Sequence, residues 1–121
     1  MDIALWIATG ALALVALVGG ITKTFVPREK LAAVHGGGWT AGVSAGFVKT
    51  LGVLELLAAA GLILPRLTGI APVLVPVTAA CWVLLMVGAM VTHGRRGETG
   101  LVALNVAYLL LAAFVLAGRV A

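Results

Sequence analysis

The chain has 121 residues, of which 63% are hydrophobic and 10% are charged. A soluble domain is about half apolar and about a quarter charged. Eight basic and four acidic residues are too few to cover a globular surface, so lipid is the expected solvent. The net charge of +4 does not indicate nucleic-acid binding, because the basic residues sit beside apolar segments as they do in membrane loops. The single cysteine, Cys81, excludes an intramolecular disulfide, and its apolar surroundings predict a small buried side chain.

Four apolar stretches are long enough to cross a bilayer as helices, which takes roughly 20 residues each. They cover about residues 3–24, 45–64, 70–93 and 99–118 of a single transmembrane domain, 1–121. Short connections favour antiparallel neighbours, so the expected fold is all-α, an integral membrane antiparallel four-helix bundle. The first stretch lacks a basic leading segment, which favours a retained anchor over a signal peptide.

Polar and cyclic residues predict where these helices begin and end. Ser44 is expected to cap the second helix, and Pro65 to end it in a turn that includes Arg66. Pro72 fits the first turn of the third helix, whereas Pro76 is expected to kink it.

The connection over residues 25–44 is long for a bundle. Pro27 followed by charged residues predicts a short interfacial helix, which the glycines at 36–38 would stop. These glycines lack the lysine of a phosphate-binding loop, so a hinge or lid is the better interpretation. Trp39 in this loop, like Trp6 in the first helix, is expected to anchor the chain at the membrane interface.

The basic residues predict the orientation. Loops one and three share one side of the membrane. That side carries six basic residues, namely Lys23, Arg28, Lys30, Lys49, Arg95 and Arg96, and the other side carries Arg66 and Arg119. The positive-inside rule places the richer side in the cytoplasm and both termini outside.

Glu55 is the single acidic residue of the second helix and lies near mid-bilayer. A charged carboxylate there costs about 2.5–3.5 kcal/mol. Three of the four residues one turn away are small, since Gly52, Ala58 and Ala59 accompany Leu51. Small residues permit close helix contact, so Glu55 is expected to face the bundle.

Lys23 lies on a similar small-residue face, behind Gly19 and Gly20. The first and second helices can therefore pack with Lys23 and Glu55 between them. Lys23 lies near the cytoplasmic end of its helix and Glu55 about ten residues deep, so the two backbones differ in depth by up to about 12 Å. A direct ion pair and a water-bridged contact both stay open.

The last two helices add further polar positions to this interior. On the fourth helix Glu98, Asn105 and Ala112 are spaced by sevens and share a face with Tyr108; on the third, His93 shares one with Met86 and Trp82. These faces predict a half-polar pocket that opens toward the cytoplasm. Its polar lining would be Lys23, Glu55, His93, Asn105 and Tyr108, with Trp82 and Met86 as its apolar wall.

Each polar residue also has a structural interpretation. Glu55 can be a carboxyl group held between helices, Lys23 can extend to the headgroups, and His93 can be an interfacial end residue. Asn105 can hold helices together, and His35 can be solvated. The sequence offers no ligand set for a metal and no recognisable cofactor motif, and two histidines are weak grounds for haem.

Several short motifs together resemble the DoxX-like family of small bacterial four-span membrane proteins. They are Gly20 to Lys23, Pro27 to Glu29, Gly61 to Pro65 after a central Glu, and His93 with residues 95–98 before Asn105. The resemblance implies a bacterial cytoplasmic membrane protein found with redox enzymes, such as terminal quinol oxidase and thiosulfate:quinone oxidoreductase. The family's recurring polar positions correspond to Lys23, Glu55 and His93.

Three functions follow as hypotheses. In the first, the chain binds a quinone-like lipophilic molecule beside a redox-enzyme partner: Glu55 exchanges protons, and Lys23 or His93 bonds a carbonyl oxygen. In the second, a stand-alone enzyme uses Glu55 as acid or base for isomerisation, cyclisation or epoxide opening of a lipophilic substrate. In the third, a non-catalytic assembly factor or carrier uses its polar residues as helix contacts. A homo-oligomer is equally compatible, because Gly88 and Ala89 form a further small-residue stripe.

Overall fold

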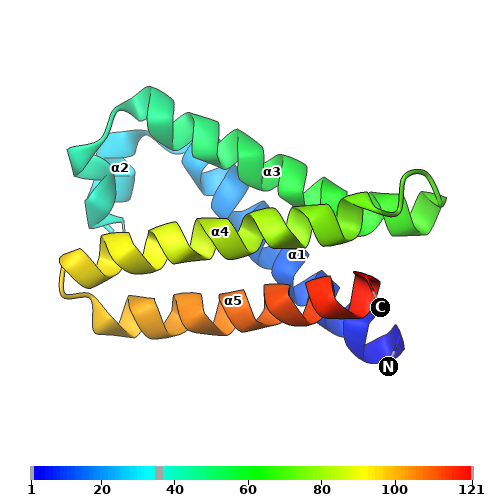
Figure 1. The fold of residues 1–121 in the computed structure, drawn as a ribbon. Helices are drawn as coiled ribbons and strands as arrows, with labels where there is room; N and C mark the ends of the chain where they lie inside the picture. Colours follow the sequence, from blue (N-terminus) through cyan, green and yellow to red (C-terminus); the bar gives the residue numbers. More distant parts are fainter. Residues whose placement is uncertain (1, 35–36, 121) are drawn as a thin grey trace.

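The computed structural model describes residues 2–34 and 37–120, and within them every regular element is helical (Figure 1). In chain order the elements are α1 (Asp2–Phe25), α2 (Arg28–Ala32), the 3₁₀-helix η1 (Gly38–Gly42), α3 (Ala45–Thr68), α4 (Leu74–Arg95) and α5 (Thr99–Val120). Within the described residues, four helices (α1, α3, α4 and α5) are long and apolar enough to cross a membrane. The predicted all-α membrane bundle is therefore confirmed.

The four long helices form a closed ring. α1 packs against α3 and α5, and α4 packs against the same two helices from the opposite side. Consecutive long helices run antiparallel, and α1 crosses behind α4 at an angle (Figure 1). The short elements α2 and η1 lie at the same end as the α4–α5 turn, while the termini and the α3–α4 turn lie at the other end.

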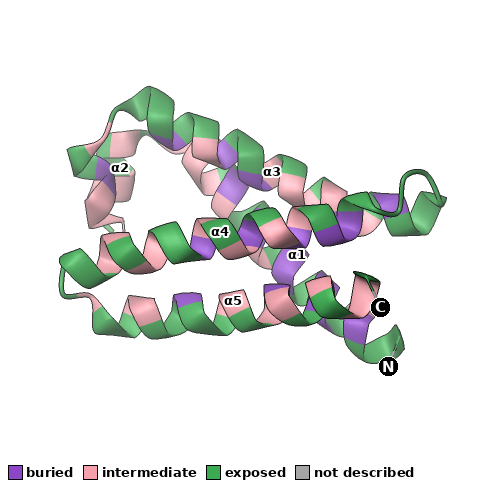
Figure 2. Cartoon of the chain, in the orientation of Figure 1, coloured by how far each residue is buried: buried purple, intermediate pink, exposed green. Residues whose placement is uncertain are grey.

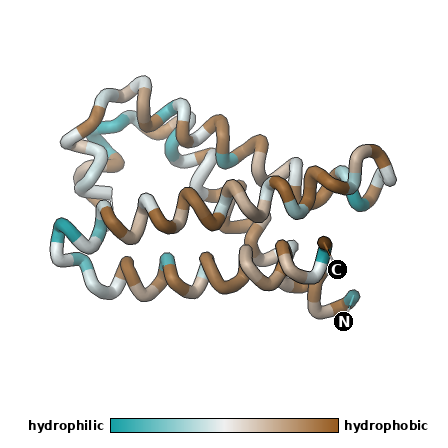
Figure 3. Tube along the Cα trace, in the orientation of Figure 1, coloured by the Kyte–Doolittle hydropathy of each residue, from teal (hydrophilic) through white to brown (hydrophobic). Residues whose placement is uncertain are grey.

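The outer surface of the bundle is apolar. Leu57, Leu84, Leu110 and Ile7 are each more than 60% exposed, and they come from the four different long helices. Exposed positions run along the whole length of these helices (Figure 2), and the polar positions gather mainly near the two ends (Figure 3). Such a surface is costly in water and neutral in hydrocarbon, which is the distribution expected of a protein dissolved in lipid.

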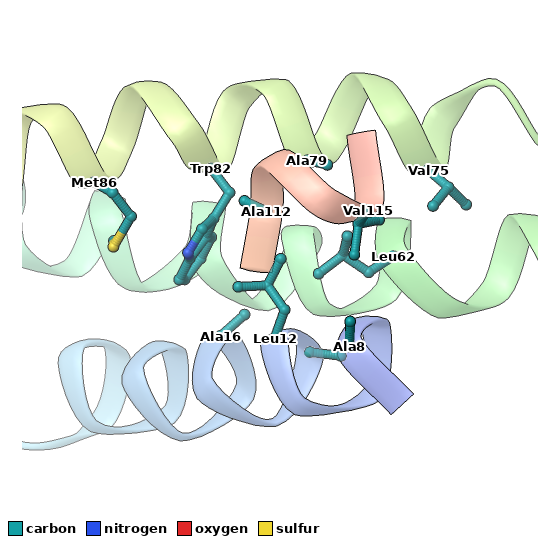
Figure 4. Close-up of a cluster of buried hydrophobic side chains, with 11 residues drawn as sticks. Ala8, Leu12, Ala16, Leu62, Val75, Ala79, Trp82, Met86, Ala112 and Val115 are labelled. Atoms are coloured by element: carbon teal, nitrogen blue, oxygen red, sulfur yellow. The ribbon is translucent and has the colours of Figure 1, made fainter. Parts of the chain in front are cut away.

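The core is built largely from small residues. Ala16, Ala79 and Ala112 are fully buried and let the helices approach closely, while Leu12 and Leu62 fill the space between them (Figure 4). Lipid offers no hydrophobic drive for helix association, so this close van der Waals contact is what holds the bundle together.

The two ends of α3 differ in how well they follow the predictions. Ser44 caps the helix as predicted, since its Oγ accepts a hydrogen bond from the Phe47 amide at 3.1 Å. The prediction that Pro65 ends the helix is wrong. Pro65 lies inside α3, which continues to Thr68 and stops at Gly69, where φ is +72°. Gly69 adopts this left-handed conformation without steric cost, and it is the actual terminator.

The prolines of α4 also sit differently from the prediction. α4 begins at Leu74, so Pro72 precedes the helix and Pro76 is its third residue. The first amides of a helix have no intrahelical acceptor, so the missing N–H of Pro76 breaks no hydrogen bond. The physical reason for the predicted kink is therefore absent at this position. In the first loop, α2 confirms the predicted short helix, although it ends at Ala32, before the glycines.

Candidate functional site

The site is positioned by a close crossing of α1 and α3. A Cβ atom added at Gly52 would lie 2.7 Å from the Thr24 amide nitrogen and 2.9 Å from the Lys23 carbonyl carbon. A Cβ at Gly20 would lie 2.9 Å from the Gly52 carbonyl oxygen. These separations are shorter than real Cβ contacts, so glycine is required on both helices for the two backbones to meet here.

The crossing brings Lys23 and Glu55 into a direct ion pair. Lys23 Nζ lies 2.9 Å from Glu55 Oε2 and donates a hydrogen bond to Oε1 at 3.2 Å. Glu55 is only 5% exposed. Because the Lys23 backbone faces Gly52, three residues before Glu55, the difference in depth is about 4.5 Å rather than the roughly 12 Å expected from the sequence.

Gly19 makes room for this pair. A Cβ atom there would lie 2.5 Å from Glu55 Oε1 and 3.4 Å from Lys23 Nζ. The small face behind Lys23 therefore serves two purposes: Gly20 permits the helix crossing, and Gly19 leaves the volume that the carboxylate occupies. Of the two arrangements that the sequence left open, the structure has the direct contact.

A cavity of about 280 Å³ opens beside the ion pair. All seven residues predicted to form the site line it: Lys23, Glu55, Trp82, Met86, His93, Asn105 and Tyr108. They come from α1, α3, α4 and α5, so the cavity occupies the interior of the ring near the end that carries α2 and η1. The structure thus brings the predicted residues together, and their chemical roles stay predictions.

Two hydrogen-bond donors at the cavity lack a partner. Within residues 2–34 and 37–120, nothing accepts a hydrogen bond from Trp82 Nε1 or Asn105 Nδ2. Trp82 is 2% exposed and Asn105 is 8% exposed, and the indole points from α4 toward α1 (Figure 4). A buried donor without a partner costs about 1–3 kcal/mol, so an acceptor oxygen that reached either donor would stabilise it.

His93 stands at the polar end of the cavity, held by the α4–α5 turn. Its Nδ1 lies 2.9 Å from Glu98 Oε1, and the same oxygen accepts a hydrogen bond from Arg96 Nε at 3.1 Å. The hydrogen bond from His93, together with Arg96, holds the pKa of the Glu98 carboxyl below its usual range. Glu98 therefore orients the imidazole through one nitrogen. This is compatible with both the ligand-binding and the interfacial interpretation of His93.

Trp39, which the sequence predicts at the membrane interface, also lines the cavity. It comes from η1 and borders the cavity and a smaller pocket beneath α2. A Cβ atom at Gly38 would collide with the Arg96 guanidinium, so η1 rests on the α4–α5 turn. A tryptophan beside glycines in a polar loop was the signal available, but only the folded loop shows where it lies. His35, expected to be solvated, lies outside the described residues.

A second hollow lies on the lipid-facing side between α3 and α4. This α3–α4 groove has a volume of about 550 Å³. Its own lining is Leu51, Leu54, Leu57 and Ala58 from α3 and Val77, Thr78, Cys81 and Leu84 from α4; it shares Glu55, Trp82 and Leu85 with the cavity. The prediction of a buried Cys81 is wrong: the thiol side of α4 faces the groove and is exposed. An apolar neighbourhood in the sequence cannot tell lipid from core.

The fold and the cavity define a class: a multi-pass membrane protein whose four helices enclose a half-polar cavity. The sequence profile of the DoxX-like family matches residues 7–115, and the chain belongs to that family. No curated protein and no solved structure matches the chain.

Proposed function

We propose that the chain binds a lipophilic small molecule with a quinone-like head in the cavity beside the Lys23–Glu55 pair. The observation that carries the proposal is the cavity itself, in which unpartnered donors from Trp82 and Asn105 lie near an ion pair. A quinone head is flat, apolar on its faces and polar at two carbonyl oxygens. It matches a site that offers N–H donors at its edges and aromatic or thioether surface from Trp82, Tyr108 and Met86.

In this proposal the ionisable residues handle protons and orientation. Lys23 or His93 donates a hydrogen bond to one carbonyl oxygen, and Glu55 accepts or donates a proton when the head changes its charge. The sequence carries no recognisable flavin, haem or iron–sulfur motif. Electrons would therefore come from a redox-enzyme partner in the same membrane or from a second quinone, which agrees with what the family resemblance implies.

The orientation and membrane belong to the proposal. Both basic loops lie at one end of the bundle, which supports cytoplasmic loops one and three and external termini in a bacterial cytoplasmic membrane. Fusions of a periplasmically active reporter to the C-terminus test this orientation. An inactive C-terminal fusion, with an active fusion at residues 95–97, would reverse the assignment.

The binding test uses decylubiquinone and purified protein in detergent, with the affinity measured by calorimetry. Asn105→Leu removes one unpartnered donor and nearly keeps the shape, and Trp82→Phe removes the other and keeps one aromatic ring. We expect each to weaken binding about five- to tenfold, which corresponds to about 1 kcal/mol for a single hydrogen bond. Leu110→Ala, on the lipid-facing side of α5, is the matched control and should leave the affinity unchanged. Wild-type affinity in both donor variants would contradict the proposal.

A stand-alone enzyme is the second candidate, favoured by the contact of Glu55 with both the cavity and Lys23. It would use the carboxyl group as acid or base in a water-poor site. Glu55→Gln separates the candidates once a turnover assay exists, because the amide keeps the shape and removes proton exchange. An assembly factor held together by the same residues needs no cavity at this position.

A further inference from the structure

We propose that the α3–α4 groove holds the hydrocarbon tail of the ligand whose head occupies the cavity, so that the ligand is an amphiphile with one long apolar chain. The proposal rests on the proposed function and narrows its substrate class. It also gives the ligand a route: the head enters sideways from the bilayer, between α3 and α4, and the tail remains in the groove.

The first support is that the two hollows are adjacent. Glu55, Trp82 and Leu85 each border both the groove and the cavity. The wall between them is therefore one layer of side chains thick. A molecule with its head near Glu55 reaches the groove by passing this layer, which Trp82 and Leu85 form together with Glu55.

The second support is size. The cavity, at about 280 Å³, falls just below the roughly 300–1,000 Å³ that is common for pockets of small-molecule ligands. It has room for a ring-sized head and little more. The groove adds about 550 Å³ of its own, which suits an alkyl chain.

The third support is the way the helices create the groove. A Cβ atom at Gly61 would lie 2.6 Å from Thr78 Oγ1, so α3 and α4 are in tight contact there. From that contact the two helices diverge toward the end that carries η1 (Figure 1). The α3 residues that line the groove, from Leu51 to Ala58, lie on this diverging side of the Gly61 contact. The groove is therefore a consequence of helix geometry rather than of a single small side chain.

The fourth support is the chemistry of the groove. Leu54, Leu57 and Leu84 face outward and are each more than half exposed. Thr78 Oγ1 donates a hydrogen bond to the Leu74 carbonyl at 2.6 Å, so the one hydroxyl in the groove is already paired within its own helix. The groove thus offers dispersion contacts and few polar ones, which favours an alkyl tail over a polar chain.

The test uses two probes with the same fully substituted head, decylubiquinone and 2,3-dimethoxy-5,6-dimethyl-1,4-benzoquinone. Cys81→Trp fills the groove from an exposed position, and Leu110→Trp adds the same side chain at an exposed position outside it. We expect Cys81→Trp to weaken decylubiquinone binding by about tenfold, while the short probe stays within about twofold of wild type. Leu110→Trp should leave both affinities unchanged.

The outcomes separate the two proposals. If wild-type protein binds neither probe, both the proposed function and the tail assignment are overturned. If both probes bind and Cys81→Trp leaves both unchanged, or weakens both equally, only the tail assignment is overturned. A wild-type dimer by light scattering that Cys81→Trp dissociates would assign the groove to a second copy and also overturn it.

A second measurement guards against misfolding of the tryptophan variant. Cys81 is the only cysteine of the chain, so octyl methanethiosulfonate modifies the wild-type protein at this one position. The attached octyl chain should weaken decylubiquinone binding by about tenfold and leave the affinity for the short probe unchanged. Removal of the octyl chain with dithiothreitol should restore decylubiquinone binding. Unchanged decylubiquinone binding by fully modified protein would overturn the assignment.

Discussion

The two halves of the bundle differ in what fills them. The half near the termini is closed: Leu12, Leu62, Ala79 and Val115 are fully or almost fully buried and interlock (Figure 4). The half near η1 holds the Lys23–Glu55 ion pair and a cavity lined by the residues of two unpartnered donors, Trp82 and Asn105. Trp82 stands between the halves, since it belongs to the apolar core cluster and also lines the cavity.

This difference shows that small residues at helix contacts have two structural outcomes in the same bundle. In the closed half, buried alanines let the helices approach closely, and the larger apolar side chains fill the core between them. In the open half, glycines bring only α1 and α3 together, and α4 diverges from α3, so polar groups and a cavity occupy the centre. The closed half is tightly packed, and the open half contains the site of the proposed ligand.

The largest effect is expected from breaking the ion pair in the open half. Lys23→Met leaves the Glu55 carboxylate without its partner and should destabilise the protein by about 3 kcal/mol at neutral pH. SDS unfolding in detergent measures this. The double variant Lys23→Met/Glu55→Leu should regain most of the loss, because no charge is left buried. Equal destabilisation of both variants would mean that packing, not charge, dominates at this site.

The second effect is expected at the helix crossing. Gly52→Ala places a methyl group against the backbone of Lys23 and Thr24, which cannot move without shifting α1. We expect a loss of about 2 kcal/mol in the free energy of unfolding and a weaker quinone affinity. Gly88→Ala is the matched control on α4, where an added Cβ meets no atom of the described residues within 4 Å. If Gly52→Ala left the free energy of unfolding unchanged, the close crossing of α1 and α3 would be contradicted.

A smaller effect is expected from the equivalent change in the closed half. A methyl group at Gly118 meets the side chain of Leu5, which can adjust its rotamer more easily than a backbone can move. Gly118→Ala should therefore cost about 1 kcal/mol by SDS unfolding and leave ligand affinity unchanged. Reduced ligand affinity in Gly118→Ala would mean that the two halves are coupled rather than independent.

The smallest effect is expected from the exposed turn that supports His93. Because the pKa of Glu98 is lowered in the folded state, its ionised form stabilises the fold above its ordinary value of 4.5. This contribution is lost as the pH falls from about 4.5 through the lowered folded pKa. Thermal unfolding should show wild type more stable than Glu98→Gln at pH 7, with the difference shrinking below pH 4.5. A pH-independent difference would exclude ionisation as its source.

Much of the fold and part of the site could be predicted because hydropathy and local helix geometry are sequence properties. Stretches of apolar residues located the four spans, and the glycine and alanine neighbours of Glu55 gave the direction of its side chain. Ser44 was recognisable as a cap because capping involves residues within one turn. The wrong predictions at Pro65 and Pro76 have a local cause too. The effect of a proline depends on its position within the helix, and the helix boundaries differ from the predicted ones.

Tertiary structure alone decided which residues meet. The direct contact of Lys23 with Glu55 requires a crossing angle, and that angle depends on glycines of two helices fitting together. Only the folded loop places Trp39 at the cavity. Only helix packing places Cys81 on the lipid side, because an apolar stretch in a membrane has the same composition whether it faces lipid or protein. The sequence by itself determined that an acid lies in the membrane facing inward. Helix packing determined that a lysine, a cavity and a groove to the bilayer lie beside it.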